Sequence, residues 1–242
     1  MALLNFRDVA SVPGTTPLTA GRLFRSAQPF HLRPAEVDLV VDSGIRTIID
    51  LRTPGEVVPP DWEPLDGRGV RVINVPLAQQ VMAAGADLPG WGHLFRGEVS
   101  VEDYLGGFYV AIAEHAIAGL AEITDAVAAG EPVLLHCAAG KDRTGTAVAL
   151  LLDLIGVPRE AIVSDYLRTN DAADDILAQL SSTSHGAETV DPTVLPPGLH
   201  TAPEPAIRRL LAHLDQVGGG RAVLAQGSDA ATLGRVAQVL TS

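Results

Sequence analysis

The segment 132–155 constrains the fold more than any other part of the chain, because it joins an apolar strand directly to an apolar helix. Pro132-Val-Leu-Leu-His136 is typical of a short buried strand, and Thr144–Ile155 is typical of a buried helix that ends at Gly156. The loop between them consists of Cys137, Ala138, Ala139, Gly140, Lys141, Asp142 and Arg143. Such a loop can point its backbone amides inward, where the helix N-terminus adds positive potential. The segment therefore predicts a phosphate-binding strand–loop–helix.

The two ends of this loop carry the chemistry. Cys137, the only cysteine of the chain, should be largely thiolate at the start of an electropositive loop, and therefore nucleophilic. Arg143 can hold two phosphate oxygens with its planar guanidinium. Gly140 permits a tight turn, and the Thr144 hydroxyl is placed to hydrogen-bond the thiolate. These residues predict hydrolysis of a phosphomonoester through a phosphocysteine, with Arg143 and the amides of residues 138–143 holding the equatorial oxygens. No metal or other cofactor is expected.

The composition fits one globular domain in a reducing compartment. The chain has 242 residues and a hydrophobic content of 47%, which is enough for a single large core. One cysteine excludes an internal disulfide and a cysteine-rich zinc site. The net charge of −12 argues against general binding to nucleic acid or acidic lipid, so a phosphate site has to be a local positive pocket.

The sequence contains no run of about 18 apolar residues that would indicate a membrane span. The first residues, Met1–Asp8, lack the pattern of a signal peptide. We therefore expect a cytoplasmic protein without stable membrane insertion, and we leave open export by a route that needs no signal peptide. The expected partner is a phosphoester substrate, and the oligomeric state is left open.

The order of apolar patterns predicts an α/β fold with a central, mostly parallel sheet flanked by helices. Besides the segment above, strands are expected at Ile45–Leu51 and Val70–Val75, and helices over 34–43, 101–129, 159–180, 203–216 and 228–241. We expect residues 1–242 to form one domain that includes the helical C-terminal segment 203–241.

Two stretches lack a regular pattern and are expected to be long loops, residues 78–100 and 181–202. The first is either a surface loop that tucks Trp91 and Phe95 onto the core or a mobile lid over the site.

His136-Cys-Ala-Ala-Gly-Lys-Asp-Arg-Thr-Gly145 resembles the signature of the cysteine-dependent protein tyrosine phosphatases. More closely, it resembles the bacterial branch that includes the mycobacterial tyrosine phosphatase B and related lipid phosphatases. The resemblance spans roughly residues 5–180 and includes Asn5–Asp8, Gly21–Ser26, Ile48–Arg52 with Glu56, and Asp165–Asn170. It implies a tyrosine-phosphatase-like fold and hydrolysis of phosphotyrosine, with phosphoserine, phosphothreonine and phosphoinositides as further candidate substrates. The partner that the resemblance implies is therefore a phosphorylated protein or a phospholipid headgroup.

Lys141 and the general acid are the open points of this site. This family and phosphoinositide phosphatases share a lysine in the loop, which implies that Lys141 supplies a second cation for lipid headgroups; alternatively it is solvated or paired with Asp50. In dual-specificity relatives the acid follows the strand that corresponds to 70–77, but here Ala78-Gln79-Gln80 contains none. The candidate acids are Asp142, which the resemblance favours, Asp87 and Asp50. Asp142 can alternatively pair with an arginine or cap the following helix.

The remaining polar residues are expected to support the site. Asp50 and Arg52 end a strand whose side chains reach the edge that holds the loop, where they either contact substrate or brace the loop from behind. Arg7 and Arg25 can line the pocket or pair with Asp8 and Glu56, and we expect the structural pairs. We expect His136, Tyr166 and Asn170 to orient the loop. His136 is not expected to act as a catalytic base, because Cys137 is already a thiolate.

Two alternatives to the phosphatase remain. A rhodanese-like sulfurtransferase also uses a cysteine loop, although Arg143 and Thr144 disfavour it. A non-catalytic phosphate-binding module would have no need of the intact Cys137.

Overall fold

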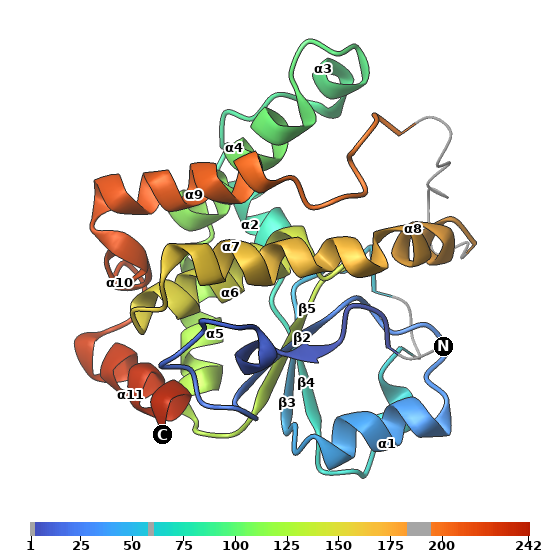
Figure 1. The fold of residues 1–242 in the computed structure, drawn as a ribbon, viewed down its shortest axis with the longest axis vertical. Coiled ribbons are helices and arrows are strands. Elements are labelled where there is room, and N and C mark those ends of the chain that lie inside the picture. The colour runs from blue at the N-terminus through green and yellow to red at the C-terminus, as the bar shows by residue number, and fades with distance from the viewer. Residues whose placement is uncertain (1–2, 58–60, 183–194) are drawn as a thin grey trace.

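A computed structural model describes residues 3–57, 61–182 and 195–242, and its centre is a five-stranded sheet (Figure 1). The strands are β1 (Arg7–Asp8), β2 (Leu23–Ser26), β3 (Thr47–Asp50), β4 (Arg71–Asn74) and β5 (Val133–His136), and their order in the sheet is β1-β2-β5-β3-β4. β1 runs antiparallel to β2, and the other neighbours are parallel. The expectation of an α/β fold with a mostly parallel sheet is confirmed.

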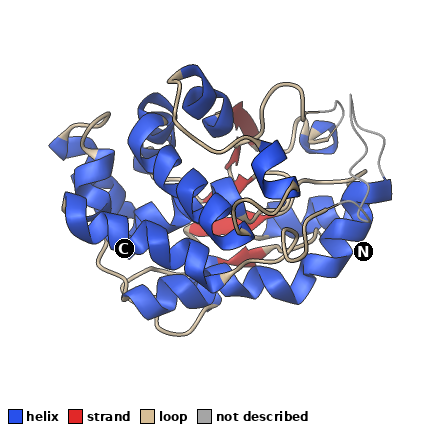
Figure 2. Cartoon of the chain, turned by 90° about the horizontal axis from the view of Figure 1, so that it is seen from above, coloured by secondary structure: helices blue, strands red, loops and turns tan. Residues whose placement is uncertain are grey.

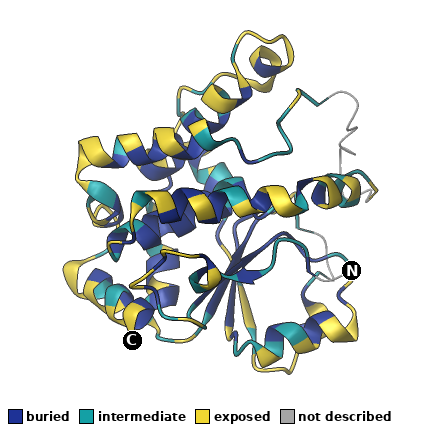
Figure 3. Cartoon of the chain, viewed as in Figure 1, coloured by how far each residue is buried: buried dark blue, intermediate teal, exposed yellow. Residues whose placement is uncertain are grey.

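The strands β2, β5 and β3 are buried on both faces, whereas the edge strand β4 is largely exposed. In β3, Ile48 belongs to the apolar cluster on one face and Ile49 to the cluster on the other, and in β5 Leu134 and Leu135 divide in the same way. Helix α1 (Pro34–Asp42) packs on the first face, and the larger helical layer covers the second. Figure 2 shows the strands enclosed between helices, and Figure 3 shows that exposed residues lie on the outer sides of these helices.

The other helices follow the chain as α2 (Leu77–Ala83), α3 (Trp91–Phe95), α4 (Val101–His115), α5 (Ile117–Ala128), α6 (Asp142–Leu154), α7 (Arg159–Leu167), α8 (Ala173–Ser182), α9 (Glu204–Val217), α10 (Gly219–Leu224) and α11 (Ala230–Thr241). Short 3-10 turns cover Val9–Ser11, Glu63–Leu65 and Arg168–Ala172. α6 is central, because most of its residues are buried and it contacts α4, α7, α9 and α10. We infer one domain for residues 1–242, because helices α9 to α11 contribute to the same apolar cluster as the sheet.

Several expected boundaries were wrong. The helix expected over 101–129 is two helices, α4 and α5, that meet at Ala116 with a bend of 76°. The helix expected over 159–180 is interrupted by the 3-10 turn Arg168–Ala172. A short helix, α10, lies between the two expected at the C-terminus. In each case packing between helices sets a break that helical periodicity along the chain does not reveal.

The segment 78–100 is not a plain loop, because it contains most of α2 and all of α3. Val81 and Leu94 are buried and anchor these helices to the core, whereas Trp91 and Phe95 are 56% and 50% exposed. The first of the two alternatives, a surface loop with both aromatic rings tucked onto the core, is therefore not what the structure shows, although Trp91 packs against Tyr104 with 5.3 Å between ring centroids. Movement of this segment as a lid stays a prediction.

In the loop expected over 181–202, residues 183–194 lie outside the described residues, α8 extends to Ser182, and residues 195–202 form turns and coil. Among the described residues no single helix is both long and apolar enough to cross a membrane; α4 and α5 pass such a test only when taken together across their bend.

Candidate active site

The loop 137–141 leaves the carboxyl end of the central strand β5 and enters α6 at Asp142. Register places Ser26 of β2 and Asp50 of β3 on either side of His136, so three strands end at the same edge beneath the loop. Cys137 is 1% exposed and lies at the base of the loop. The strand–loop–helix expected from the sequence is therefore present.

The loop is held from outside through its carbonyl groups. The backbone amide of Gln28 donates to the Ala138 carbonyl at 3.0 Å. The side-chain Nδ2 of Asn5 donates to the carbonyls of Ala139 and Gly140 at 3.1 Å each. Arg25 Nη2 also donates to the Gly140 carbonyl, at 2.6 Å. Within the described part of the chain, no group accepts a hydrogen bond from the amides of residues 138–141. The loop therefore has free amide donors, as an anion site requires.

Gly140 allows this close approach to β2. Its φ is +65°, and a Cβ at this position would lie 2.1 Å from the Ser26 carbonyl oxygen. Both the left-handed backbone and the lack of space require glycine here.

Arg143 is oriented by a carboxylate from another loop. Its Nη1 and Nη2 donate to the two oxygens of Glu56 at 2.6 and 2.7 Å, and Glu56 Oε2 also accepts from the amide and hydroxyl of Thr53, both at 2.8 Å. Burial opposes the charged form of Glu56, yet the hydrogen bonds from Arg143 and Thr53 lower its pKa to about 2. Burial likewise opposes the charge on Arg143, and the nearby Cys137 and Glu56 more than offset it, so the pKa of Arg143 is raised. The guanidinium thus faces the nucleophile with a fixed orientation.

Asp142 is held by a pair of tyrosines. Tyr109 of α4 donates to Asp142 Oδ1 at 2.5 Å, and the hydroxyls of Tyr109 and Tyr166 are 2.8 Å apart. Burial raises the pKa of Tyr109 well above its usual value, and the Asp142 carboxylate raises it further, so this phenol keeps its proton. Because a phenol has one proton and Tyr109 gives it to Asp142, Tyr166 is the donor to Tyr109. One oxygen of Asp142 is thereby occupied, and the side chain remains 24% exposed.

The other two candidate acids lie in different surroundings. Asp87 is exposed, and no hydrogen bond or ion pair joins it to the loop in the described part of the chain. Asp50 is buried and accepts from Arg52 through both oxygens, at 3.0 and 2.7 Å. Burial raises the pKa of Asp50, but His136 and Arg52 outweigh it and lower the pKa. Of the three, only Asp142 combines a place at the end of the loop, where α6 begins, with partial exposure.

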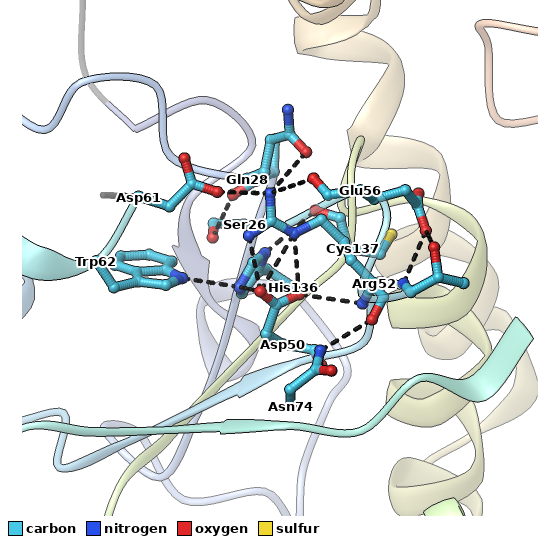
Figure 4. A network of polar contacts seen from close by, with 12 residues as sticks. Ser26, Gln28, Asp50, Arg52, Glu56, Asp61, Trp62, Asn74, His136 and Cys137 are labelled. Atoms are coloured by element: carbon cyan, nitrogen blue, oxygen red, sulfur yellow. Dashed lines mark hydrogen bonds and ion pairs between the residues drawn. The ribbon is translucent and has the colours of Figure 1, made fainter. Parts of the chain in front are cut away.

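Figure 4 shows the polar network behind Cys137. Arg52 is 1% exposed and binds Asp50, Gln28 and Asp61. Such burial supports the view that Asp50 and Arg52 brace the loop, and their contact with substrate stays a prediction. Trp62 Nε1 donates to His136 Nε2 at 3.0 Å, and since indole is only a donor, the proton of neutral His136 sits on Nδ1, 3.2 Å from the Cys137 carbonyl. Burial lowers the pKa of His136 to about 4, so it is neutral at pH 7.

A second buried cluster lies beneath the loop. Asp165 of α7 pairs with Arg7 at 2.9 Å and with Arg25, whose other nitrogen reaches Gly140. Burial opposes the charged form of Asp165, but the two arginines outweigh it and lower the pKa. Both arginines form structural pairs as expected, but the expected partners Asp8 and Glu56 were wrong, because Asp165 pairs with both arginines and Glu56 pairs with Arg143.

Lys141 and Thr144 complete the loop. Lys141 is 3% exposed, and its ammonium contacts the carbonyls of Leu199 and Thr201. A pair with Asp50, one of the arrangements considered for this lysine, is not formed. The Thr144 hydroxyl is buried and has no hydrogen-bond partner in the described part of the chain, so it is free to serve the thiolate. Of the other expected supports, Tyr166 hydrogen-bonds Tyr109 and lies against Gly145 in the first turn of α6, whereas Asn170 binds the amide and carbonyl of Ala202.

Sequence reasoning did not single out four of the residues that hold this site. Asn5 and Gln28 hold the loop, Tyr109 holds Asp142, and Trp62 sets the tautomer of His136. Asn5 lay within a segment that resembled the phosphatases, so that segment carried a signal. The other three lie in segments whose pattern indicates only core or loop. Among the described residues no group of three or more His, Cys, Asp and Glu side chains could hold a metal ion.

Comparison with known proteins agrees with this geometry. A model of the tyrosine phosphatase family matches residues 1–233. The chain is 36% identical over 197 residues to the triple specificity protein phosphatase PtpB of Mycobacterium tuberculosis, covering 73% of this chain and 70% of that protein. It is 34% identical over 154 residues to a tyrosine-protein phosphatase of Nostoc commune, covering 62% of this chain and 49% of that protein.

Proposed function

This chain belongs to the tyrosine phosphatase family, and on that basis we propose that it hydrolyses phosphomonoesters, phosphotyrosine first among them, through a phosphocysteine on Cys137. The observation that carries this proposal is the loop 137–143, in which the nucleophile, free amide donors and the oriented guanidinium of Arg143 face one another. Neither a rhodanese-like sulfurtransferase nor a non-catalytic phosphate-binding module needs the nucleophile, the amide donors and the arginine together.

In the first step the Cys137 sulfur attacks phosphorus, the S–P bond forms, and the bond to the leaving oxygen breaks. The amides of the loop and the free N–H groups of Arg143 hold the three equatorial oxygens, where negative charge is stabilised. Glu56 occupies one N–H of each terminal nitrogen of Arg143, so the Nε proton and the remaining terminal protons stay available for phosphate.

Asp142 is the proposed general acid. Tyr109 occupies Oδ1, so the proton for the leaving group resides on Oδ2 and passes to the leaving oxygen as the P–O bond breaks. In the second step Asp142 takes a proton from water, the water oxygen attacks phosphorus, and the S–P bond breaks. The unpartnered hydroxyl of Thr144 then stabilises the thiolate that leaves.

The substrate class is proposed from the similarity to PtpB. PtpB is named for triple specificity, and we propose for this chain a similar breadth across phosphotyrosine, phosphoserine or phosphothreonine, and phosphoinositides. Phosphorylated proteins are the proposed main partners. A cytoplasmic place of action stays a prediction.

The test is turnover of a generic aryl phosphate and of phosphotyrosine peptides by the wild type and by Cys137→Ser. We expect measurable hydrolysis by the wild type, and no turnover by the variant although it still binds inorganic phosphate. Acid-quenched wild-type enzyme with radiolabelled substrate should carry one phosphate on the peptide that contains Cys137. Undiminished turnover by Cys137→Ser would refute the mechanism, and thiocyanate production by the wild type would favour the sulfurtransferase.

A further inference from the structure

A cavity beside the phosphate loop has no part in the steps of hydrolysis. Its volume is about 320 Å³, and its walls come from Leu3 and Leu4 near the N-terminus, the loop 28–33 after β2, the start of α1 and the end of α8. Figure 1 shows the N-terminal segment and α8 on the same side of the molecule. A cavity of this size is large enough to hold a small ligand or a side chain.

The cavity lies at the edge of the sheet that holds the nucleophile. Ser26, the last residue of β2, pairs in register with His136, so the loop after β2 and the phosphate loop leave the sheet at the same edge. Gln28 lines the cavity, and its backbone amide donates at 3.0 Å to the carbonyl of Ala138, which directly follows Cys137. The cavity and the phosphate loop are therefore neighbours that share a wall.

The N-terminal wall of the cavity is joined to the phosphate loop as well. Leu4 precedes Asn5, whose side chain binds the carbonyls of Ala139 and Gly140. Successive residues of an extended peptide are about 3.3–3.6 Å apart, so a side chain about one to three positions from a phosphotyrosine spans the distance between adjoining pockets. A peptide whose phosphotyrosine enters the loop can therefore place such a side chain in the cavity.

The walls of the cavity favour an apolar side chain. Leu3, Leu32 and Phe30 supply apolar surface. Of the described wall residues, the two that are charged at pH 7 pair with each other, since Arg33 Nη2 donates to Glu36 Oε1 at 2.7 Å. The other carboxylate oxygen, Glu36 Oε2, accepts from the backbone amide of Arg33 at 2.9 Å. The wall thus has no net charge with which to attract an acidic or a basic side chain.

We propose that this cavity is a specificity subsite, which takes an apolar side chain close to the phosphotyrosine of a polypeptide substrate. The inference rests on the proposed function and deepens it, because it specifies a part of the polypeptide beyond the phosphorylated residue. Removing part of a leucine side chain from water in this cavity should raise kcat/KM by about tenfold.

The first experiment uses the wild-type protein and alanine-based phosphotyrosine peptides. A single leucine is moved through each position from three before to three after the phosphotyrosine, and kcat/KM is measured for each peptide. We expect one responsive position, at which leucine raises kcat/KM about tenfold over alanine and at which glutamate and lysine do not. Equal kcat/KM values for all leucine peptides, or a preference for a charged side chain at the responsive position, would overturn the proposal.

The second experiment changes one wall of the cavity. Leu4→Gln places a polar side chain there without a change of charge, and Val217→Gln is the matched control, because Val217 is exposed on α9, away from the cavity walls. The ratio of kcat/KM for the leucine peptide to that for the alanine peptide should fall from about ten to below about three in Leu4→Gln and stay at about ten in Val217→Gln. A ratio that stays at about ten in Leu4→Gln would contradict the proposed place of the leucine.

Cross-linking locates the side chain without using turnover. Because Cys137 is the only cysteine, the Cys137→Ser variant has no thiol, and a second substitution, Leu4→Cys or Val217→Cys, then supplies the only one. A phosphotyrosine peptide with cysteine at the responsive position should form a disulfide with Leu4→Cys/Cys137→Ser at least about tenfold faster than with Val217→Cys/Cys137→Ser, because binding raises the local concentration of its thiol. The unphosphorylated peptide should lose this advantage.

Equal cross-linking rates in the two double variants would place the peptide side chain outside the cavity and overturn the proposal. Absence of turnover on every phosphoester would refute the proposed function instead. In that case the cross-linking rates, measured with cysteine at each peptide position in turn, would still decide whether the cavity takes a side chain of a bound phosphopeptide.

Discussion

Replacing Gly140 with alanine should damage both stability and catalysis, by amounts that follow from the geometry of the loop. The new Cβ would lie 2.1 Å from the Ser26 carbonyl oxygen, 2.4 Å from its carbon and 2.7 Å from the Ala27 nitrogen. All three atoms belong to the backbone of β2 or its extension, so no side-chain rotation relieves the contact. To reach 3.0 Å, below which real Cβ contacts are essentially unknown, the loop has to retreat by at least 0.9 Å.

Two costs add in this variant. A non-glycine residue at φ +65° costs roughly 1–2 kcal/mol, and forcing an extra methyl group into a packed site costs about 1–3 kcal/mol more. The free energy of unfolding should therefore fall by about 2–5 kcal/mol. A displacement of nearly 1 Å in the groups that hold the phosphate should lower kcat/KM by about 10²-fold.

Gly156→Ala is the matched control. Gly156 also has a positive φ, of +78°, but no heavy atom of the described residues lies within 4 Å of a Cβ built there. This variant should lose only the roughly 1–2 kcal/mol of the left-handed backbone and keep its kcat/KM. Urea unfolding followed by circular dichroism gives the stabilities, and turnover of an aryl phosphate gives the rates. Equal losses of stability in the two variants, with full activity in Gly140→Ala, would refute the proposed close packing of the loop on β2.

Further predictions concern the acid, the oriented arginine and pH. Asp142→Asn should slow hydrolysis of alkyl phosphates by about 10²-fold or more and of aryl phosphates with good leaving groups far less; equal slowing would move the acid elsewhere. Tyr109→Phe removes one hydrogen bond to Asp142 and should show the same pattern at about fivefold, the rate equivalent of ~1 kcal/mol. Glu56→Gln should weaken inhibition by inorganic phosphate and lower kcat/KM about tenfold, because a charge-assisted bidentate bond to Arg143 is lost; tighter phosphate binding would instead show that Glu56 competes for the guanidinium. The pKa of His136 is about 4 when folded and 6.5 in its ordinary state, so the unfolded chain takes up this proton first as pH falls. The contribution of neutral His136 to the free energy of unfolding should be complete above pH ~6.5, and about 3 kcal/mol of it should be lost by pH ~4. Urea titrations of the wild type and His136→Gln should differ by this amount, and identical pH profiles would contradict it.

Much of the scaffold could be predicted from local patterns. The strands that flank the site and the buried helix α6 follow from apolar runs bounded by glycine and proline, which depend only on neighbouring residues. The breaks at Ala116 and at Arg168–Ala172 could not be predicted, because both sides of each break have helical patterns and packing decides where the axis turns. The same limit applies to 78–100, whose short helices depend on burial of Val81 and Leu94.

The supports of the loop were beyond sequence reasoning for a related reason. Tyr109 lies 33 residues from Asp142, and Asn5 lies 134 residues from Ala139. Nothing in the identity of a tyrosine in a helix or an asparagine near the N-terminus predicts which distant residue it will contact. A hydrogen bond of this kind exists only after the helices and strands have packed.

The amino-acid sequence by itself determined the reaction chemistry of this protein. A nucleophile, a run of small residues and an arginine, placed between a strand and a helix, form a phosphate cradle through local backbone geometry. Only the tertiary structure decided what each charge in that cradle does. Lys141 faces the carbonyls of residues 199 and 201, Arg143 faces Glu56, and Asp142 faces Tyr109. The physical reason is that the energy of a charge depends on its burial and its nearest partners, and both are set by segments far away along the chain.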